Sequence, residues 1–211
     1  AGDFTTSGGL LGASCLTLNG SSEYATATTA HFRSTDSAGT IEAWIKTSSS
    51  DDMTILGTSN TAGSSHYHRI GVEAGKVQIE HKDSSVIYRV ASTNSVNDGK
   101  WHHIVVISDG SAISIYIDGK EETPVVETGS NNGDWFADLT IGGSAPDNVT
   151  IGAMTQTSTS TYFSGSIDEV RVWSTARTVT QIRTNMFTEV AGDAAGLEHQ
   201  WSCNAGTGTT D

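Results

Sequence analysis

The stretch that decides the fold is residues 101–120, WHHIVVISDGSAISIYIDGK. As a strand, its first half points Trp101, His103, Val105 and Ile107 to one side, and the isoleucines of its second half alternate with polar residues. A period of two is typical of β-strands with one face on a core. Between the halves, Asp109-Gly110 provides the residue types of a tight turn. The stretch therefore predicts an antiparallel hairpin. Its predicted buried residues are Val105, Ile107, Ile113, Ile115 and Ile117.

Composition narrows the functional classes. The chain has 211 residues with 23 Gly and 2 Pro, and 11 basic against 24 acidic residues give a net charge of −13. This charge repels a phosphate backbone, so we expect no nucleic-acid partner. No apolar run approaches the roughly 20 residues of a membrane span. The acidic composition suits a secreted or extracellular protein or a virion surface. Because the chain opens at Ala1, we expect a removed leader or a module of a larger chain or assembly.

Short alternating runs, separated by Gly, Asp or Ser, recur along the chain. Further strands are predicted at 14–18, 23–29, 39–47, 53–57, 66–73, 76–81, 86–91, 139–141, 149–151, 165–173 and 197–203. One helix is predicted at 178–187, with Thr178 as its N-cap. The pattern predicts an all-β, antiparallel two-sheet sandwich with one short helix near the C-terminus, in a single domain over 1–211.

Three motifs carry a family resemblance: W-H-H-x-V-x-x-x-D-G, I-x-I-Y-I-D-G-K and F-S-G-S-I-D-E-V-R-V-W. In this order they resemble laminin-G-like and pentraxin-like modules of the concanavalin A-like lectin/glucanase superfamily. SCLTLNGSSEYA and LEHQWSCNAGTGTT are similar to the opening and closing strands of that family. The resemblance implies a jelly-roll sandwich. It does not specify a ligand, because the same sandwich hosts lectins, adhesins, hydrolases, lyases and spacers.

The glucanase branch of that superfamily places carboxylates at E-x-D-x-x-E on one strand, where they act as nucleophile and acid. That spacing is absent, because Ser166 stands where the first Glu would be needed before Asp168. No G-x-S-x-G nucleophile motif occurs either. We therefore expect a non-catalytic protein and keep a polysaccharide hydrolase or lyase as the third alternative.

The loop at 131–136 has the composition of a sugar-contacting loop. An aromatic face can stack on a pyranose, and Asp and Asn can bind its hydroxyls. The alternative is that Trp135 fills the end of the sandwich. His66 and His68 share a strand face at a spacing that could bind a metal, or they form a polar surface. The candidate ligand-binding residues are Trp135, Phe136, Asp134, Asp147, Asn148, His66, His68 and Arg69.

Cys15 and Cys203 lie near opposite ends of the chain. They are either two unrelated buried thiols or a disulfide between the first and last strands. In the resembling family these strands pair, which implies that the two cysteines lie close together.

Asp168 lies on the strand at 165–173, on the same side as the apolar Val170 and Val172. An inward carboxylate needs a metal, an Arg or several N–H donors. Related jelly rolls imply a structural Ca²⁺ where this strand meets the opening one, with Asn19 and Glu23 as companion ligands. The alternative is that Asp168 caps loop N–H groups.

The leading hypothesis is a recognition module that binds a glycan, or a cell-surface or particle protein, through loops at one sandwich edge. The runner-up is a structural or adhesin spacer module without a soluble ligand of its own.

Overall fold

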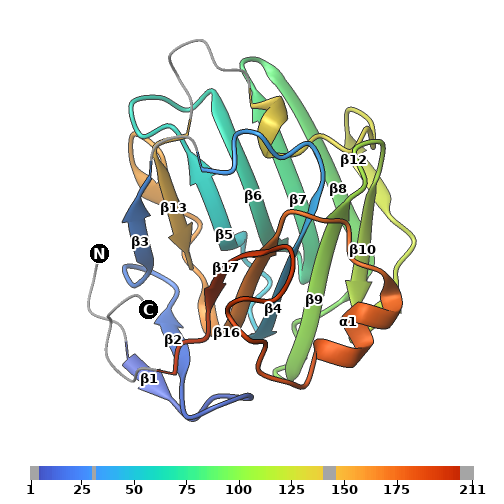
Figure 1. The fold of residues 1–211 in the computed structure, drawn as a ribbon. Helices are drawn as coiled ribbons and strands as arrows, with labels where there is room; N and C mark the ends of the chain where they lie inside the picture. The colour runs from blue at the N-terminus through green and yellow to red at the C-terminus, as the bar shows by residue number, and fades with distance from the viewer. Residues whose placement is uncertain (1–4, 30–31, 140–145, 205–211) are drawn as a thin grey trace.

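Two antiparallel β-sheets face each other in the computed structural model, which describes residues 5–29, 32–139 and 146–204 (Figure 1). Sheet A contains, in spatial order, β1 (Thr5–Ser7), β2 (Cys15–Asn19), β16 (Ser164–Trp173), β4 (Gly39–Lys46), β9 (Trp101–Ser108), β10 (Ile113–Ile117) and β11 (Lys120–Glu121), and β17 (Leu197–Trp201) also pairs with β16. Sheet B contains β12 (Val125–Thr128), β8 (Val86–Ser95), β7 (Lys76–Asp83), β6 (His66–Glu73), β5 (Met53–Ser59), β13 (Asn148–Ile151) and β3 (Ala25–Thr28). The predicted all-β jelly-roll sandwich is confirmed.

The central hairpin forms as predicted, by β9 and β10. Its turn is held by Asp109, whose Oδ1 accepts the backbone N–H groups of Ser111 and Ala112, each at 2.8 Å. The isoleucines of β10 face the core between the sheets. Val105 and Ile107 are also buried, but they lie on the opposite face of β9, under a helix. The expectation of a single buried face is therefore wrong for β9.

The helix is α1 (Val179–Asn185), which Figure 1 shows beside β9 and β10 on the outer side of sheet A. Its N-cap is Thr178, as predicted: the Thr178 Oγ1 accepts the Gln181 N–H at 3.3 Å, and the Gln181 Oε1 accepts the Thr178 N–H at 2.9 Å. Ile182 packs against the outer side chains of β9. Within the described residues, no helix has the length and apolar character of a membrane span.

Several short elements were not expected from the sequence. They are β1, β11, β12, β14 (Met154–Thr155), β15 (Thr159–Ser160) and the 3-10 helix η1 (Phe136–Asp138). Runs of two to four residues are too short to show a period. The strand predicted at 139–141 falls largely outside the described residues, and Leu139 follows η1 as its C-cap.

Candidate functional site

The outer face of sheet B carries polar side chains in register across three strands. Arg69 of β6 lies opposite Glu80 of β7, and Glu80 lies opposite Arg89 of β8. Because alternate residues of a strand share a face, Tyr67 and Gln78 lie on the same side. Intervening residues of these strands, such as Ile70, Ile79 and Val90, belong to the core between the sheets. Strand alternation therefore places this polar group on the outside of the sandwich.

Glu80 accepts hydrogen bonds from two neighbours. Its Oε2 accepts the Arg89 Nε–H at 2.6 Å and also the Nη2–H, and its Oε1 accepts the Tyr67 hydroxyl. Burial, and then the hydrogen bond to Glu80, raise the pKa of Tyr67, so the phenol keeps its proton. Burial alone would lower the pKa of Arg89, but the hydrogen bond and charge of Glu80 raise it. The neutral Tyr67 hydroxyl and the Arg89 guanidinium thus both donate to the Glu80 carboxylate.

Gln78 is the other organising residue, and it is 2% exposed. Its Nε2 donates to the Glu73 Oε2 at 2.9 Å and to the Glu127 Oε2 at 2.7 Å. Its Oε1 is buried and, among the residues that the structure describes, accepts no hydrogen bond. We call Tyr67, Glu73, Gln78, Glu80, Arg89 and Glu127 the sheet B face.

The sheet B face is bounded on one side by the β14–β15 hairpin. A Cβ on Gly57 of β5 would lie 2.7 Å from the Met154 Sδ, so the hairpin sits directly on β5. Arg69 marks the border: it is 5% exposed, and its Nε donates to the Thr54 Oγ1 at 2.8 Å while its Nη2 donates to Asp52. On the other side Val125 of β12 is 41% exposed. Strands β6, β7, β8 and β12 therefore carry the open part of the face.

The prediction that Trp135 and Phe136 are exposed for sugar stacking is wrong. Their exposed fractions are 0% and 1%, and both belong to the core. The predicted ligand residue His68 packs against both rings and is itself 0% exposed. A large aromatic ring on a polar loop buries more apolar surface by filling the sandwich end than by facing water. These three residues offer no surface to a ligand.

The remaining loop candidates are dispersed. Asp147 accepts the N–H and hydroxyl of Thr61 at 2.9 and 2.8 Å. Asn148 is 5% exposed and accepts from Ser59. The His66 Nε2 lies 3.0 Å from the Asp83 Oδ1, and the described residues hold no cluster of three or more His, Cys, Asp or Glu side chains that could bind a metal. The predicted binding edge is therefore not assembled from these loops.

Asp134 lies by the buried His81, and its charge opposes the lowering of the His81 pKa by burial. Among the predicted ligand residues, Arg69 lies at the border of the sheet B face.

Asp168 is held as the capping alternative describes. Its Oδ2 accepts the N–H groups of Leu10 and Leu11 at 2.9 and 3.3 Å, and its Oδ1 accepts that of Glu169 at 2.9 Å. Burial is the main cause that raises the pKa of Asp168 to about 6. A register shift in β16 follows this residue.

The companion calcium ligands are not brought to Asp168. Asn19 pairs with Ser164, four residues along β16, which is about 13 Å away at the rise of a strand. Glu23 precedes β3, which belongs to the other sheet. The predicted three-residue ligand set is therefore wrong, and calcium at Asp168 itself stays a prediction, tested by the melting temperature with Ca²⁺ and with chelator.

The two cysteines approach one another without a disulfide between them. Strands β2 and β17 pair with successive parts of the same edge of β16, through Leu16 and Trp201. The Ser14 hydroxyl donates to the Cys203 carbonyl at 2.6 Å. The expected proximity is confirmed, although the strands meet end to end rather than side by side. Burial raises the pKa of the Cys203 thiol to about 12, which makes it a poor nucleophile. The disulfide stays a prediction.

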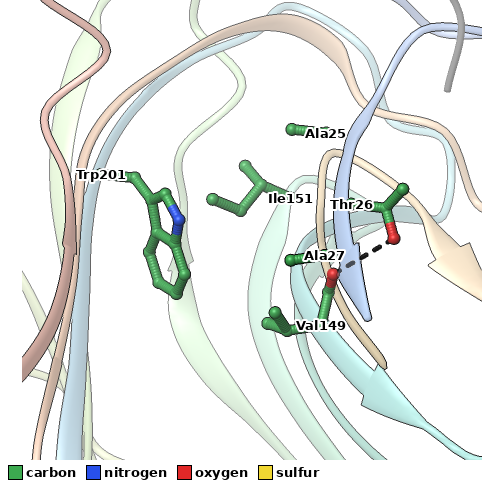
Figure 2. A pocket seen from close by; sticks show the side chains of 6 residues that line it. All are labelled: Ala25, Thr26, Ala27, Val149, Ile151 and Trp201. Atoms are coloured by element: carbon green, nitrogen blue, oxygen red, sulfur yellow. Dashed lines mark hydrogen bonds between the residues drawn. The ribbon is translucent and has the colours of Figure 1, made fainter. Parts of the chain in front are cut away.

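An apolar notch lies where the edges of the two sheets approach (Figure 2). The Trp201 indole faces Ala27, Val149 and Ile151 across it, while the Thr26 hydroxyl donates to the Val149 carbonyl at 3.3 Å. The notch holds about 30 Å³ of space, on the order of one or two water molecules. It is too small to enclose a sugar ring and its lining is mainly apolar, so we assign it to sealing the core edge.

The sheet B face lies on strands, so the composition of the loops does not reveal it. The available signal was the polar half of each alternating strand. Within 66–73, 76–81 and 86–91, the outward positions carry Tyr67, Arg69, Gln78, Glu80 and Arg89. Three consecutive strands with charged outward positions indicate a polar face, but their register comes only from the structure.

Comparison with known proteins agrees with the fold. A laminin-G-type family model, described as the Concanavalin A-like lectin/glucanases superfamily, matches residues 19–183. The mouse basement membrane-specific heparan sulfate proteoglycan core protein is 29% identical over 114 residues. This alignment covers 53% of the chain and 3% of the proteoglycan, so the chain spans a small part of that relative.

Solved structures with a similar fold include the following two. Domain 4 of AbnA, a GH43 extracellular arabinanase from Geobacillus stearothermophilus, in complex with arabinotriose, has a TM-score of 0.67 at 20% identity, covering 90% of this chain and 82% of that one. The CBM40 of Ruminococcus gnavus IT-sialidase bound to α2,3-sialyllactose has a TM-score of 0.60 at 17% identity, covering 77% and 96%. At these identities the similarity concerns the fold, and the site rests on the residues of this chain.

Proposed function

Because the chain belongs to the concanavalin A-like lectin/glucanases superfamily, we propose that it is a glycan-binding module with the sheet B face as its binding surface. The observation that carries the proposal is a set of accessible polar groups around the buried Gln78. The Arg89 side chain is 31% exposed and gives two of its N–H groups to Glu80, and the partly exposed Glu73 and exposed Glu127 each accept from Gln78 through one oxygen. Sugar hydroxyls can accept from the remaining Arg89 N–H groups and donate to the remaining carboxylate oxygens.

The named ligands of similar structures support the same class. Those proteins are described as bound to arabinotriose and to sialyllactose, and both ligands are glycans. We place the module outside the cell, as part of a larger chain that it attaches to a glycan-bearing cell or particle surface. The extracellular arabinanase and the 3% coverage of the basement-membrane proteoglycan support this setting.

The test is a glycan array, followed by NMR titration of the isotope-labelled chain with a bound sugar. We expect the amide shifts to change in β6, β7, β8 and β12, and to stay constant in β9 and β10 of sheet A. An array without any binder contradicts the proposal and supports the structural-spacer alternative. Shifts confined to another surface reject the sheet B face as the site.

A second candidate, glycoside hydrolysis, is favoured by one observation. Glu73 and Glu127 bond to the same amide nitrogen at 2.9 and 2.7 Å, so these two oxygens are within about 6 Å of each other, in the range of a carboxylate pair. Incubation of array-positive polysaccharides with the protein, followed by assay of new reducing ends, tests it. Release that Glu73→Gln abolishes supports hydrolysis, and no release leaves binding as the function.

A further inference from the structure

We infer that the chain has a second binding site, a pocket beside β17 that takes a small organic ligand with a primary ammonium group. The pocket holds about 330 Å³ of space, within the range of small-molecule sites. It lies on sheet A, apart from the sheet B face, so the inference does not depend on the proposed function. We call its lining residues the β17 pocket: Glu189, Val190, Gly192, Gln200, Ser202 and Asn204.

The two walls of the β17 pocket are tied to each other and to the sandwich. One wall follows α1 and is anchored by the Thr188 carbonyl, which accepts an Arg171 Nη2–H at 2.8 Å. The other wall consists of β17, which pairs with β16 (Figure 1), and the residues after it. Asn204 joins the walls: its Nδ2 donates to the Glu189 Oε1 at 3.2 Å, while its Oδ1 accepts the Ala13 N–H at 2.9 Å. The pocket is therefore preformed, which lowers the entropy cost of binding.

Three oxygens of the β17 pocket can accept hydrogen bonds from a ligand. Glu189 uses its Oε1 on Asn204, which leaves its Oε2. Gln200 donates its Nε2–H to the Glu169 Oε2 at 3.3 Å, and this contact turns the Gln200 Oε1 away from Glu169. The Gln200 Oε1 and the Ser202 hydroxyl bond to no described residue, and neither is a buried atom without a partner, so both are accessible. A primary ammonium has three N–H donors and no acceptor, which matches these three oxygens.

Charge favours the same ligand. The lining contains the Glu189 carboxylate and, within the described residues, no Lys, Arg or His. Glu189 makes no ion pair with a described residue, unlike the 1% exposed Glu169 behind Gln200, which pairs with Arg171 at 2.6 Å. From residue 184 to the C-terminus the sequence has acidic residues at 189, 193, 198 and 211 and no Lys or Arg. An organic cation would supply the missing partner of Glu189, whereas an anion would be repelled.

The experiment is an NMR titration of the isotope-labelled chain with two ammonium ligands and one neutral control. Glucosamine carries the ammonium on a sugar ring, Nα-acetyllysine amide carries it on an alkyl chain, and N-acetylglucosamine has the ring without the charge. We expect saturable shifts of the amides at 189–192 and 200–204 with an ammonium ligand, and at least about tenfold weaker binding of N-acetylglucosamine, which lacks the charge-assisted hydrogen bond. The tighter of the two ammonium ligands identifies the carrier of the group.

Three results would overturn the inference. Equal Kd values for glucosamine and N-acetylglucosamine would show that the pocket reads the ring and not the ammonium. The same shifts with calcium chloride, together with displacement of glucosamine, would show a site for divalent cations. Unchanged amides at 189–192 and 200–204 with both ammonium ligands would show that the pocket binds neither. None of these results bears on the sheet B face, whose amides in β6, β7, β8 and β12 are followed in the same spectra.

A matched pair of variants assigns the binding to the carboxylate. Glu189→Gln removes the charge but keeps an oxygen that can accept from Asn204, and Glu121→Gln makes the same change on the exposed β11 at the other edge of sheet A. We expect Glu189→Gln to weaken the ammonium ligand about tenfold at an unchanged melting temperature, while Glu121→Gln leaves its Kd unchanged. Added salt should weaken binding to the natural chain, because an accessible ion pair is screened. Equal Kd values in the two variants would reject Glu189 as the partner of the ammonium and overturn the inference.

Discussion

The outer faces of both sheets carry paired Glu and Arg side chains, but the pair on sheet A is buried and the pair on sheet B is partly exposed. On sheet A, Glu42 and Arg171 are 0% and 1% exposed beneath α1 and the residues that follow it. On sheet B, the Glu80 side chain is 6% exposed, but that of its partner Arg89 is 31% exposed. A Glu–Arg pair therefore does not identify a binding face by itself. Whether the pair can meet a ligand depends on whether other parts of the chain cover it.

The cover of sheet A is held by the charged face beneath it. Arg171 donates to the Asn185 and Thr188 carbonyls at 3.3 and 2.8 Å, and the Trp44 indole donates to the Met186 carbonyl at 2.8 Å. Burial would raise the pKa of Glu42, but the hydrogen bond and charge of its neighbours His103 and Arg171 lower it overall. Donors that could serve a ligand on sheet B instead bind the protein's own backbone on sheet A.

Removing the guanidinium from each face should give the largest difference. Arg171→Met leaves the carboxylates of Glu42 and Glu169 buried without their cation, and we expect it to cost about 3–5 kcal/mol of unfolding free energy. Arg89→Met should cost about 1–2 kcal/mol, because water can reach the position of a partly exposed side chain. Urea denaturation of both variants measures the two losses. Equal losses would show that the faces are equally sealed.

Truncating an apolar residue on each face should give the next largest difference. Ile182 on α1 is 0% exposed and packs on Val105 and Ile107, so Ile182→Ala should cost about 2–5 kcal/mol through the cavity it leaves. Val125 of β12 is 41% exposed, and Val125→Ala should change stability by about 0.5 kcal/mol or less. Thermal and urea unfolding provide the comparison. A small loss for Ile182→Ala would mean that α1 contributes little to the cover of sheet A.

Acid should lower the unfolding free energy through His68 and His81, which are buried between the two sheets. Burial lowers the pKa of both His68 and His81 in the folded chain, although the charges of Asp134, Asp138 and Asp83 oppose it for His81. A histidine that stays neutral when folded binds its proton only on unfolding, so its full contribution is present above its ordinary pKa near 6.5 and is lost as pH falls. We expect a slope of up to about 1.4 kcal/mol per pH unit for each histidine.

The measurement is the unfolding free energy between pH 7 and pH 4.5 for the natural chain and for His68→Gln. The variant should show a shallower loss with acid, and identical slopes would contradict the assignment. The pKa of Asp168 is raised to about 6, so its contribution has the opposite sign: stability from this group falls as pH rises through that range. Because Asp168 is present in both proteins, its effect cancels in the difference of slopes.

The smallest expected effect on stability belongs to Glu127→Gln. Glu127 lies on the exposed edge strand β12, where its Oε2 accepts a hydrogen bond from the Gln78 Nε2 at 2.7 Å. We expect a change of about 0.5 kcal/mol or less by urea denaturation, because the amide can still accept from Gln78. Binding should change while stability does not. A large loss of stability would instead show that the sheet B face stabilises the fold, as the outer face of sheet A does.

Local patterns predicted much of the fold because each acts within a few residues. The strands β9 and β10, the turn at Asp109 and the N-cap at Thr178 all formed where the sequence placed them. The candidate site was predicted less well. Trp135 on a loop of Asn, Gly and Asp looks exposed in sequence. In the structure it is 0% exposed, because the distant His68 and the neighbouring Phe136 pack against it.

The sequence by itself determined the strands, the helix, the superfamily and the acidic character of this protein, because periodicity, capping and composition are properties of neighbouring residues. Only the tertiary structure decided which polar residues are available. Register brings Glu80 and Arg89 together on β7 and β8, a bulged β12 brings Glu127 to Gln78, and α1 covers the corresponding charges of sheet A. Pairing and cover join residues far apart in the chain, and no local pattern contains that information.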